Sequence, residues 1–536
     1  MQFNSIPFLI AFAVFLILYA FCPERWRRFL MLAGSVAYVA ANSWQAALWA
    51  LLFALANFVM GVCIQRTAWK KATMGMAVAL NAVALATFKL LNVGMLGLSY
   101  YLFSFISYLA EIYRQTLQAE NDPVRFASFT FFFPKYTQGP ITRYGELAGQ
   151  LDKPRYTTAG LQRGLESFVL GFVLKILVVD KLNLPWQILG TGEPGYYNLL
   201  TIGYESISTK LAWLGAVTTS LHIFIEWQAY MYMALGIASM LGYKLPQNFN
   251  SPYIARTVGD YYRRWHMTLT RWFKDYIYIP LGGSRQGICR TVVNVLFVWL
   301  LTSVWHGNGL APKYLLWGVL AGAAVALDPV WYRKMKARFG ENSGWGVSLL
   351  GHLWVLLLIP LSVVILLKPD SGFNFILWGM SIGVMIVIER LWKTFVTERF
   401  RIGEKLEKKG AVGKVWKVFV SVLAHIWVVI PIILTWVLFT IRDLDDLAVY
   451  FGRLFPAAGA SAGADPTDFG KYLAMLWPWI LIGIFFCFPL ADGLLRRIGK
   501  SRVGSWILSV ILAALFWYAV YILTQTGSDP MGYAAF

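Results

Sequence analysis

The chain has only five histidines, and His306 stands at the end of an uncharged run, directly before a polar turn. In the stretch "SVWHGNG", from Ser303 to Gly309, the small residues leave room for a substrate or for backbone to approach closely. A neutral imidazole can accept a proton from an alcohol at physiological pH. The pattern indicates a general base that acts on a hydroxyl group, with a purely structural role left open. We expect the neighbours Trp305 and Asn308 to line or support this site.

The other four histidines have weaker signals. His266 follows "YYRR" and could position a substrate that enters from the cytoplasm, or could contact a lipid headgroup. His222 and Glu226 are one helical turn apart and share a face, which favours a structural pair. His352 and His425 have no polar cluster nearby in the sequence and are predicted to be hydrogen-bonded core residues.

Other catalytic patterns are absent from the sequence. There is no G-x-x-x-x-G-K-[ST] phosphate loop, no H-E-x-x-H and no G-x-S-x-G. No C-x-x-C spacing occurs among the scattered cysteines Cys22, Cys63, Cys289 and Cys487. This argues against a disulfide framework or a zinc site. We therefore predict no metal and no bound cofactor.

The elements that must hold these side chains are membrane helices. The 536-residue chain is 58% hydrophobic, whereas soluble domains are about half apolar. Apolar windows lie at about 6–22, 29–42, 44–64, 73–91, 93–113, 164–182, 209–242, 290–306, 312–330, 346–366, 373–391, 415–439, 471–491 and 504–524. A span needs about 20 residues. The pattern predicts an all-α polytopic membrane protein, in which 6–22 is a retained span and 209–242 is a tilted or broken helix.

Charge predicts how the chain is oriented. The formal charge of +20 comes largely from clusters in connectors that follow odd-numbered windows, such as "ERFRIGEKLEKKGAVGKVWK". The positive-inside rule assigns these connectors to the cytoplasm. Both termini and the acidic connector "RDLDDLAVYF" then lie outside. No basic stripe forms a separate domain, so no nucleic-acid partner is expected.

Two segments do not fit simple spans. In "FASFTFFFPKYTQGPITRY", 126–144, the apolar part is too short to cross and is interrupted by Pro134, Gly139 and Pro140. Irregular backbone at membrane depth must be covered by protein or line a cavity, so a re-entrant or interfacial segment is expected. The segment 260–285, "DYYRRWHMTLTRWFKDYIYIPLGGSR", places aromatic residues on one helical face, which predicts an amphipathic interfacial helix that ends near Pro280.

Taken in order, several motifs resemble those of the membrane-bound O-acyltransferases (MBOAT). They are "GLSYYLFSFISYLAEIYR", "FFFPKYTQGPITRY", "YYRRWHMTLTRWFKDYIYIPLGG" and "SVWHGNGLAPKYLLWG", and together they cover about 95–330. The chain looks most similar to the bacterial branch with the alginate O-acetylase membrane subunit, the peptidoglycan O-acetylation protein and the teichoic acid D-alanyl transfer protein. Where that branch has an "FDFSGYSDMAIG"-like stretch, this chain has "FIEWQAYMYMALG", in which Glu226 matches the first acid and Tyr232 replaces the second.

The resemblance implies a ring of transmembrane helices with a thin central partition and a tunnel. It places the family's near-invariant histidine at His306 and its second motif position at His266. It divides the chain into N-terminal helices (1–92), a catalytic core (93–330) and C-terminal helices (331–536). It also implies a place in a bacterial inner membrane and a serine hydrolase-like (SGNH-type) partner, or other polysaccharide machinery, on the outer side.

Residues and resemblance together predict transfer of an acyl group, foremost acetyl, from a cytoplasmic thioester to an exported polysaccharide. The donor, acetyl-CoA or a phosphopantetheinyl acyl carrier protein, is anionic and would meet basic residues on the cytoplasmic side, namely Arg143, Arg263, Arg264, Arg271 and Lys274. The alternatives are D-alanyl transfer from a carrier to teichoic acid, a lipid or protein O-acyltransferase, a transporter without bond chemistry, and a scaffold subunit. Membrane lipids are expected partners in every case.

Overall fold

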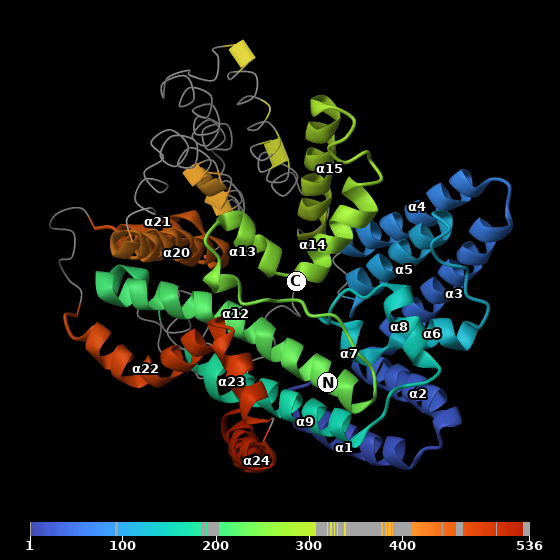
Figure 1. Ribbon diagram of the computed structural model, residues 1–536, viewed down its shortest axis with the longest axis horizontal. Coiled ribbons are helices and arrows are strands. Elements are labelled where there is room, and N and C mark those ends of the chain that lie inside the picture. The colour runs from blue at the N-terminus through green and yellow to red at the C-terminus, as the bar shows by residue number, and fades with distance from the viewer. Residues whose placement is uncertain are drawn as a thin grey trace.

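The computed structural model describes residues 2–91, 95–183, 189, 203–306, 410–441, 443–456, 465–499 and 501–528, with scattered helical positions between 319 and 389. All regular structure in these residues is helical (Figure 1). The predicted all-α class is confirmed. The predictions for Asn308 and His352 lie outside the described residues, as do the side chains of Trp305 and His306.

The elements up to Met240 come first along the chain. They are α1 (Ile6–Phe21), α2 (Glu24–Asn42), α3 (Trp44–Arg66), α4 (Lys70–Leu90), α5 (Leu98–Tyr113), α6 (Pro123–Phe131), α7 (Phe133–Tyr136), α8 (Tyr144–Leu151), α9 (Thr158–Val173), the π-helical turn η1 (Leu174–Val179), α10 (Asp180–Leu182), η2 (Tyr204–Ser206) and α12 (Thr209–Met240). The elements after Met240 are η3 (Pro252–Ile254), α13 (Val258–Arg264), α14 (Met267–Phe273), the π-helical turn η4 (Lys274–Tyr278), α15 (Ile288–His306), α20 (Gly410–Thr440), α21 (Leu444–Leu454), α22 (Asp468–Cys487), α23 (Leu490–Ile498) and α24 (Arg502–Thr526).

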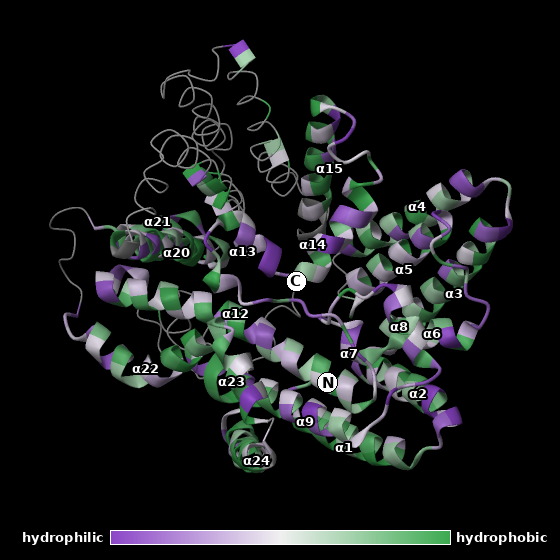
Figure 2. Ribbon diagram, in the orientation of Figure 1, coloured by the Kyte–Doolittle hydropathy of each residue, from purple (hydrophilic) through white to green (hydrophobic). Residues whose placement is uncertain are grey.

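Five of the described helices are long and apolar enough to cross a membrane, namely α3, α4, α20, α22 and α24. Only 17–33% of their most apolar windows is buried inside the protein. Figure 2 shows apolar colouring over most of α20 and α24. A helix that is apolar on its exposed face needs an apolar surrounding, which the lipid provides. These helices agree with the predicted windows to within a few residues.

The packed centre of the protein is the pair α9 and α12, which lie side by side across the middle of Figure 1. α12 is one continuous helix of 32 residues, so of the two forms predicted for 209–242 the broken one is excluded. Glycines let the two backbones touch, because a Cβ at Gly164 would lie 2.6 Å from the carbonyl oxygen of Gly236. The Ser167 hydroxyl donates across the same seam to the carbonyl of Tyr232 at 2.8 Å. Small residues at such seams are typical of membrane helix pairs.

The segment 126–144 does not form a simple span, as predicted. α6 and α7 are separated by a bend at Phe132, and the chain after α7 turns sharply at Gly139, where a Cβ would collide with the backbone of Lys135. The turn is anchored to α12 by the Thr137 hydroxyl, which lies 2.6 Å from the hydroxyl of Tyr230. Most of the segment is buried. Irregular backbone is thus covered by protein, as an apolar surrounding requires.

The prediction of one continuous helix over 260–280 is wrong. The chain breaks between α13 and α14 at His266, whose φ is +44°, in the left-handed region. The break is held open by a neighbouring loop, because the Met267 amide donates to the Asn248 carbonyl at 2.8 Å and the Asn250 amide donates to the Arg264 carbonyl at 3.0 Å. The two halves pack in different places. Trp272 of α14 stacks on Phe103 of α5, whereas Trp265 lies against Trp436 of α20.

Candidate functional site

The helices α14 and α15 form a hairpin that carries both motif histidines. Its closed end is fastened by the Asn294 side chain, which donates to the Gly283 carbonyl at 2.9 Å. Further along, Val298 and Leu301 of α15 pack against the cluster that contains Trp272. Beyond these contacts α15 continues to its last residue, His306, and α14 runs back to its first turn at His266. Since the two helices are antiparallel, both histidine positions lie toward the open end of the hairpin.

The His266 ring is buried in the turn between α13 and α14. Its exposed fraction is 7%, and its centroid lies 5.5 Å from the ring of Trp227 on α12 and 6.3 Å from that of Phe249. Neither ring nitrogen has a hydrogen-bond partner among the described residues. Burial lowers the pKa of His266, so the ring is neutral at physiological pH. A neutral imidazole with both nitrogens available can donate to one group and accept from another.

Polar groups from three distant segments meet beside this turn. The Asn248 side-chain oxygen accepts from the Thr268 hydroxyl at 2.9 Å. The same hydroxyl accepts from the Ile141 amide of the loop after α7 at 3.1 Å. One turn earlier in that loop, the Gln138 amide donates to the Tyr230 hydroxyl of α12 at 3.3 Å. The motif around 131–144 and the motif around His266 are therefore joined directly, although 127 residues separate Ile141 from Thr268.

The predicted donor-binding cations fall into two groups, each with its own acidic partners. In the first group, Arg143 pairs with Asp275, and Arg271 pairs with Glu146 at 2.7 Å. Lys274, which belongs to the same surface, is exposed. Two of these three cations are therefore already paired with carboxylates. Such half-exposed pairs are weak, so an anionic ligand could compete for the guanidinium groups.

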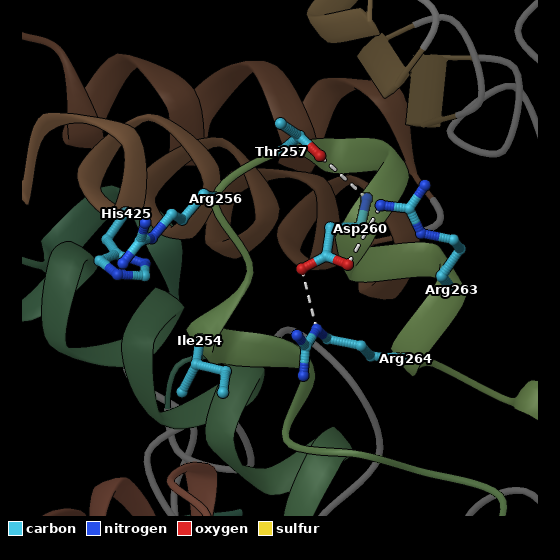
Figure 3. Close-up of a pocket in the computed structure, with 7 residues that line it drawn as sticks. All are labelled: Ile254, Arg256, Thr257, Asp260, Arg263, Arg264 and His425. Carbon is cyan, nitrogen blue, oxygen red and sulfur yellow. Dashed lines mark hydrogen bonds and ion pairs between the residues drawn. The ribbon is translucent and has the colours of Figure 1, made fainter. Parts of the chain in front are cut away.

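The second group lines a cavity of about 490 Å³ between α13 and α20 (Figure 3). Arg263 and Arg264 both pair with Asp260, at 3.2 and 2.8 Å. Arg256 and His425 line the same cavity and were not predicted to belong to any site. The hydrogen bond predicted for His425 is present, from the ring to the Ala255 carbonyl at 3.1 Å, but the residue is only partly buried and lines the cavity. No local sequence pattern could connect Arg256 with His425, because 169 positions separate these two residues.

His222 and Glu226 belong to a buried ionic cluster rather than to an isolated pair. Lys175 of η1, which is 0% exposed, lies 2.7 Å from Asp180 and 3.4 Å from Glu226. The His222 ring lies 3.9 Å from the other Glu226 oxygen and 3.2 Å from the Val179 carbonyl. Sequence reasoning missed Lys175, yet one signal could have found it: a charge inside the apolar window 164–182.

Tyr232, which stands where the bacterial pattern has its second acid, lies on α12 beside α22. Its ring lies edge-on against Phe486 of α22, with the centroids 6.4 Å apart. Within the described residues there is also no group of three or more histidine, cysteine, aspartate or glutamate side chains that could hold a metal ion. The described part of the site therefore provides acid–base and hydrogen-bonding groups, together with cations.

Comparison with known proteins agrees with these motifs. The family model of the membrane-bound O-acyltransferases matches residues 34–366. A "probable alginate O-acetylase AlgI" of Pseudomonas fluorescens is 30% identical over 343 residues, which are 61% of this chain and 66% of that protein. A "peptidoglycan O-acetyltransferase" of Helicobacter pylori is 30% identical over 262 residues, 43% of this chain and 47% of that protein. A "teichoic acid D-alanyltransferase" of Bacillus subtilis is 28% identical over 239 residues, 42% of this chain and 57% of that protein.

Proposed function

Since the chain belongs to the membrane-bound O-acyltransferase family and is therefore an acyltransferase, we propose that it moves an acyl group, foremost acetyl, from a cytoplasmic thioester to a hydroxyl of an exported cell-surface polysaccharide. The transfer is direct or passes through a partner protein. The observation that carries the proposal is the α14–α15 hairpin, in which the two motif histidine positions lie toward the same end. The names of the relatives, which include two O-acetylases, support acetyl as the group.

In the proposed reaction His306 is the general base. Its imidazole takes the proton of the acceptor hydroxyl while the hydroxyl oxygen attacks the thioester carbonyl. The tetrahedral adduct then expels the donor thiolate, which receives the proton from the imidazolium, so the ring returns to its neutral form. A positioned base of this kind contributes about 10²–10⁴-fold to the rate. Apolar walls around the reacting atoms would exclude water and limit hydrolysis of the thioester.

His266 is proposed to position the substrate, because its buried ring has two nitrogens without partners among the described residues. A ligand group that hydrogen-bonds this ring would satisfy a buried polar side chain, which is otherwise costly. Trp305 and Asn308 are proposed to support the reacting ring of His306. Glu226 and His222 are proposed to line or support the tunnel from helix α12. The ion pair with Lys175 holds the glutamate in place.

The five basic residues Arg143, Arg263, Arg264, Arg271 and Lys274 are proposed to attract the phosphates of the donor, either acetyl-CoA or a phosphopantetheinyl acyl carrier. Guanidinium groups bind phosphate through paired, charge-assisted hydrogen bonds. The exposure of Lys274 and the weak acidic partners of Arg143 and Arg271 support this role. Half-exposed pairs can be replaced by a ligand at little cost in stability.

We place the protein in the bacterial inner membrane, with the catalytic core at 93–330 between N-terminal and C-terminal helices and with both termini outside. The hydrogen bond between the side chains of Asn4 and Ser528, 3.1 Å long, supports a common side for the two ends. An SGNH-type acyltransferase on the outer side is the proposed protein partner, and lipids surround the apolar helices.

The test is His306→Ala, measured with labelled acetyl-CoA supplied to the cytoplasmic side of membranes. Label on the exported acceptor should fall by at least about 10²-fold, because the general base is lost. Expression and thermal stability should stay near those of the unaltered protein. His352→Ala is the matched control, since that histidine is predicted to be structural, and it should keep its activity. Full activity in His306→Ala would refute the role of the base.

A second candidate is D-alanyl transfer from a carrier protein to teichoic acid, which the B. subtilis relative favours. Its experiment replaces labelled acetyl-CoA with a carrier protein that bears labelled D-alanine. Transfer from the carrier without transfer from acetyl-CoA would select this candidate. The same His306→Ala variant should abolish it, because the acceptor hydroxyl needs the same base.

A further inference from the structure

The cavity between α13 and α20 combines three guanidinium groups with one carboxylate. Its lining comes from two places in the sequence, the run from Ile254 to Arg264 and His425 of α20. Figure 3 shows Asp260 between Arg263 and Arg264, with Arg256 and His425 on the other side of the cavity. Hydrogen bonds from Arg264 and Arg263 outweigh the effect of burial and hold the pKa of Asp260 below its usual value. The carboxylate therefore stays charged, and the cavity keeps an excess of positive charge.

Two of the arginines have guanidinium groups available to a ligand. Arg256 is exposed, and no carboxylate within the described ranges pairs with it. Arg263 is 72% exposed, and its one ion pair with a described residue is the 3.2 Å contact with Asp260. By contrast, Arg264 is held more firmly, since it also donates to the Asn250 carbonyl at 3.2 Å. Arg264 therefore has a fixed position in the lining, whereas Arg256 and Arg263 can move toward a bound anion.

The histidine contributes a defined ring orientation. His425 Nδ1 lies 3.1 Å from the Ala255 carbonyl oxygen, which can only accept. Nδ1 must therefore carry the hydrogen, and Nε2 is the nitrogen that remains for a ligand. A ligand with a hydroxyl or a protonated phosphate oxygen could donate to Nε2, while its anionic oxygens meet the arginines. This combination suits a phosphate better than a carboxylate, which cannot usually donate at neutral pH.

We propose that this cavity binds a phosphate group, and that Arg256, Arg263, Arg264 and His425 form the site. Two sources have this chemistry. One is the phosphates of a coenzyme A donor, in which case the inference rests on the proposed function. The other is the headgroup of an anionic phospholipid, which α20 makes accessible because Val422 and Ile426, next to His425, are exposed apolar residues. Arginine is suited to either, since its planar fork binds phosphate oxygens in pairs.

The experiment measures binding to the purified full-length protein in a neutral detergent, without any acceptor. The probes are coenzyme A, dephospho-coenzyme A, and mixed micelles that contain phosphatidylglycerol or phosphatidylcholine. Arg256→Gln removes from the cavity a charge that has no carboxylate partner among the described residues. It should weaken binding of the true ligand about tenfold, the usual effect of losing a charge-assisted hydrogen bond. Arg285→Gln is the matched control, because Arg285 is also exposed, carries the same charge and does not line the cavity.

The outcomes separate the sources. Weaker binding of coenzyme A in Arg256→Gln, with no change in Arg285→Gln, supports a donor phosphate, and a larger effect with coenzyme A than with its dephospho form assigns the 3′-phosphate. Weaker binding of phosphatidylglycerol alone supports a lipid headgroup. The proposal is overturned if Arg256→Gln binds every probe normally, or if both variants weaken binding equally. Arg263→Gln serves as a second cavity variant. His306→Ala should bind normally, so a failure of the proposed reaction would not be confused with a failure of this site.

Discussion

The α9–α12 core and the segment from α13 to α14 differ in whether their buried ionisable groups have partners. In the core, the helices are continuous, glycines bring their backbones into contact, and the buried Lys175 lies between two carboxylates. In the α13–α14 segment, the helix is broken, His266 has a positive φ, and its buried ring has no hydrogen-bond partner among the described residues.

This difference indicates that the α9–α12 core serves stability and that the turn at His266 serves function. Substitution of a buried charge that has partners on both sides lowers the stability of the protein, because the partners then remain as uncompensated charges in an apolar surrounding. A buried ring without a partner is a cost that the fold tolerates, and such costs are concentrated at sites where a ligand supplies the missing hydrogen bond. We therefore expect substitutions in the core to lower stability and substitutions at His266 to change activity and pH dependence.

The largest effect should follow Lys175→Met. This change leaves Asp180 and Glu226 without their shared cation in the protein interior and should lower the free energy of unfolding by about 3–5 kcal/mol. The measurement is thermal unfolding of the purified protein in detergent. Lys210→Met, on the first turn of α12 where the side chain is exposed, is the control and should change little.

The charge balance in the core can be tested separately. A triple variant with Lys175→Met, Asp180→Asn and Glu226→Gln carries no charge at these three positions and should be more stable than Lys175→Met alone. If the single and the triple variants are equally stable, the effect of Lys175→Met does not come from the two carboxylates left without their shared cation.

A smaller effect is expected from the pH dependence at His266. Burial lowers the pKa of the folded ring below its usual 6.5, so the unfolded chain takes up a proton at a pH where the folded chain does not. Stability should be unaffected by this ring above pH 6.5 and should fall as the pH drops from there toward the folded pKa. His266→Asn, which tolerates a positive φ, removes the effect. Unfolding curves of the two proteins between pH 5 and 8 should therefore separate only on the acidic side, and parallel curves would contradict the buried, neutral ring.

The smallest effect is expected for the half-exposed pair Arg271–Glu146, whose side chains are 36% and 33% exposed. Arg271→Gln and Glu146→Gln, singly and together, should reveal a coupling of no more than about 1 kcal/mol in the free energy of unfolding, and less at high salt. A coupling as large as that of the Lys175 cluster would mean that the half-exposed pair and the buried cluster do not differ in strength.

Most of the helices could be predicted from the sequence, because apolar windows depend on composition over about 20 residues. The windows 44–64 and 504–524, for example, appear as Trp44–Arg66 and Arg502–Thr526. The break at His266 could not be predicted in this way. The aromatic spacing continues across it, and the hydrogen bonds that hold it open come from Asn248 and Asn250, a separate loop.

The candidate site was also only partly visible in the sequence. The motif around His306 stood out through its composition, and its catalytic role stays a prediction. The charge of Arg263 and Arg264 predicts donor binding, but the cavity that they line also includes Arg256 and His425. No local sequence pattern connects His425 with the three arginines. The acidic partners of Arg143 and Arg271 were invisible for the same reason, since each pair joins residues more than 120 positions apart.

From the sequence alone one can tell that this is a helical membrane protein, where most of its spans lie, and which motifs resemble those of an acyltransferase. These properties depend on local composition and spacing, which are readable without a fold. The folded arrangement is needed to see which buried charges are paired, where the interfacial helix breaks, and which arginines share a cavity with a histidine. Those properties depend on contacts between distant segments, and the free energy of a buried or half-exposed charge is set by its partners and by its access to water.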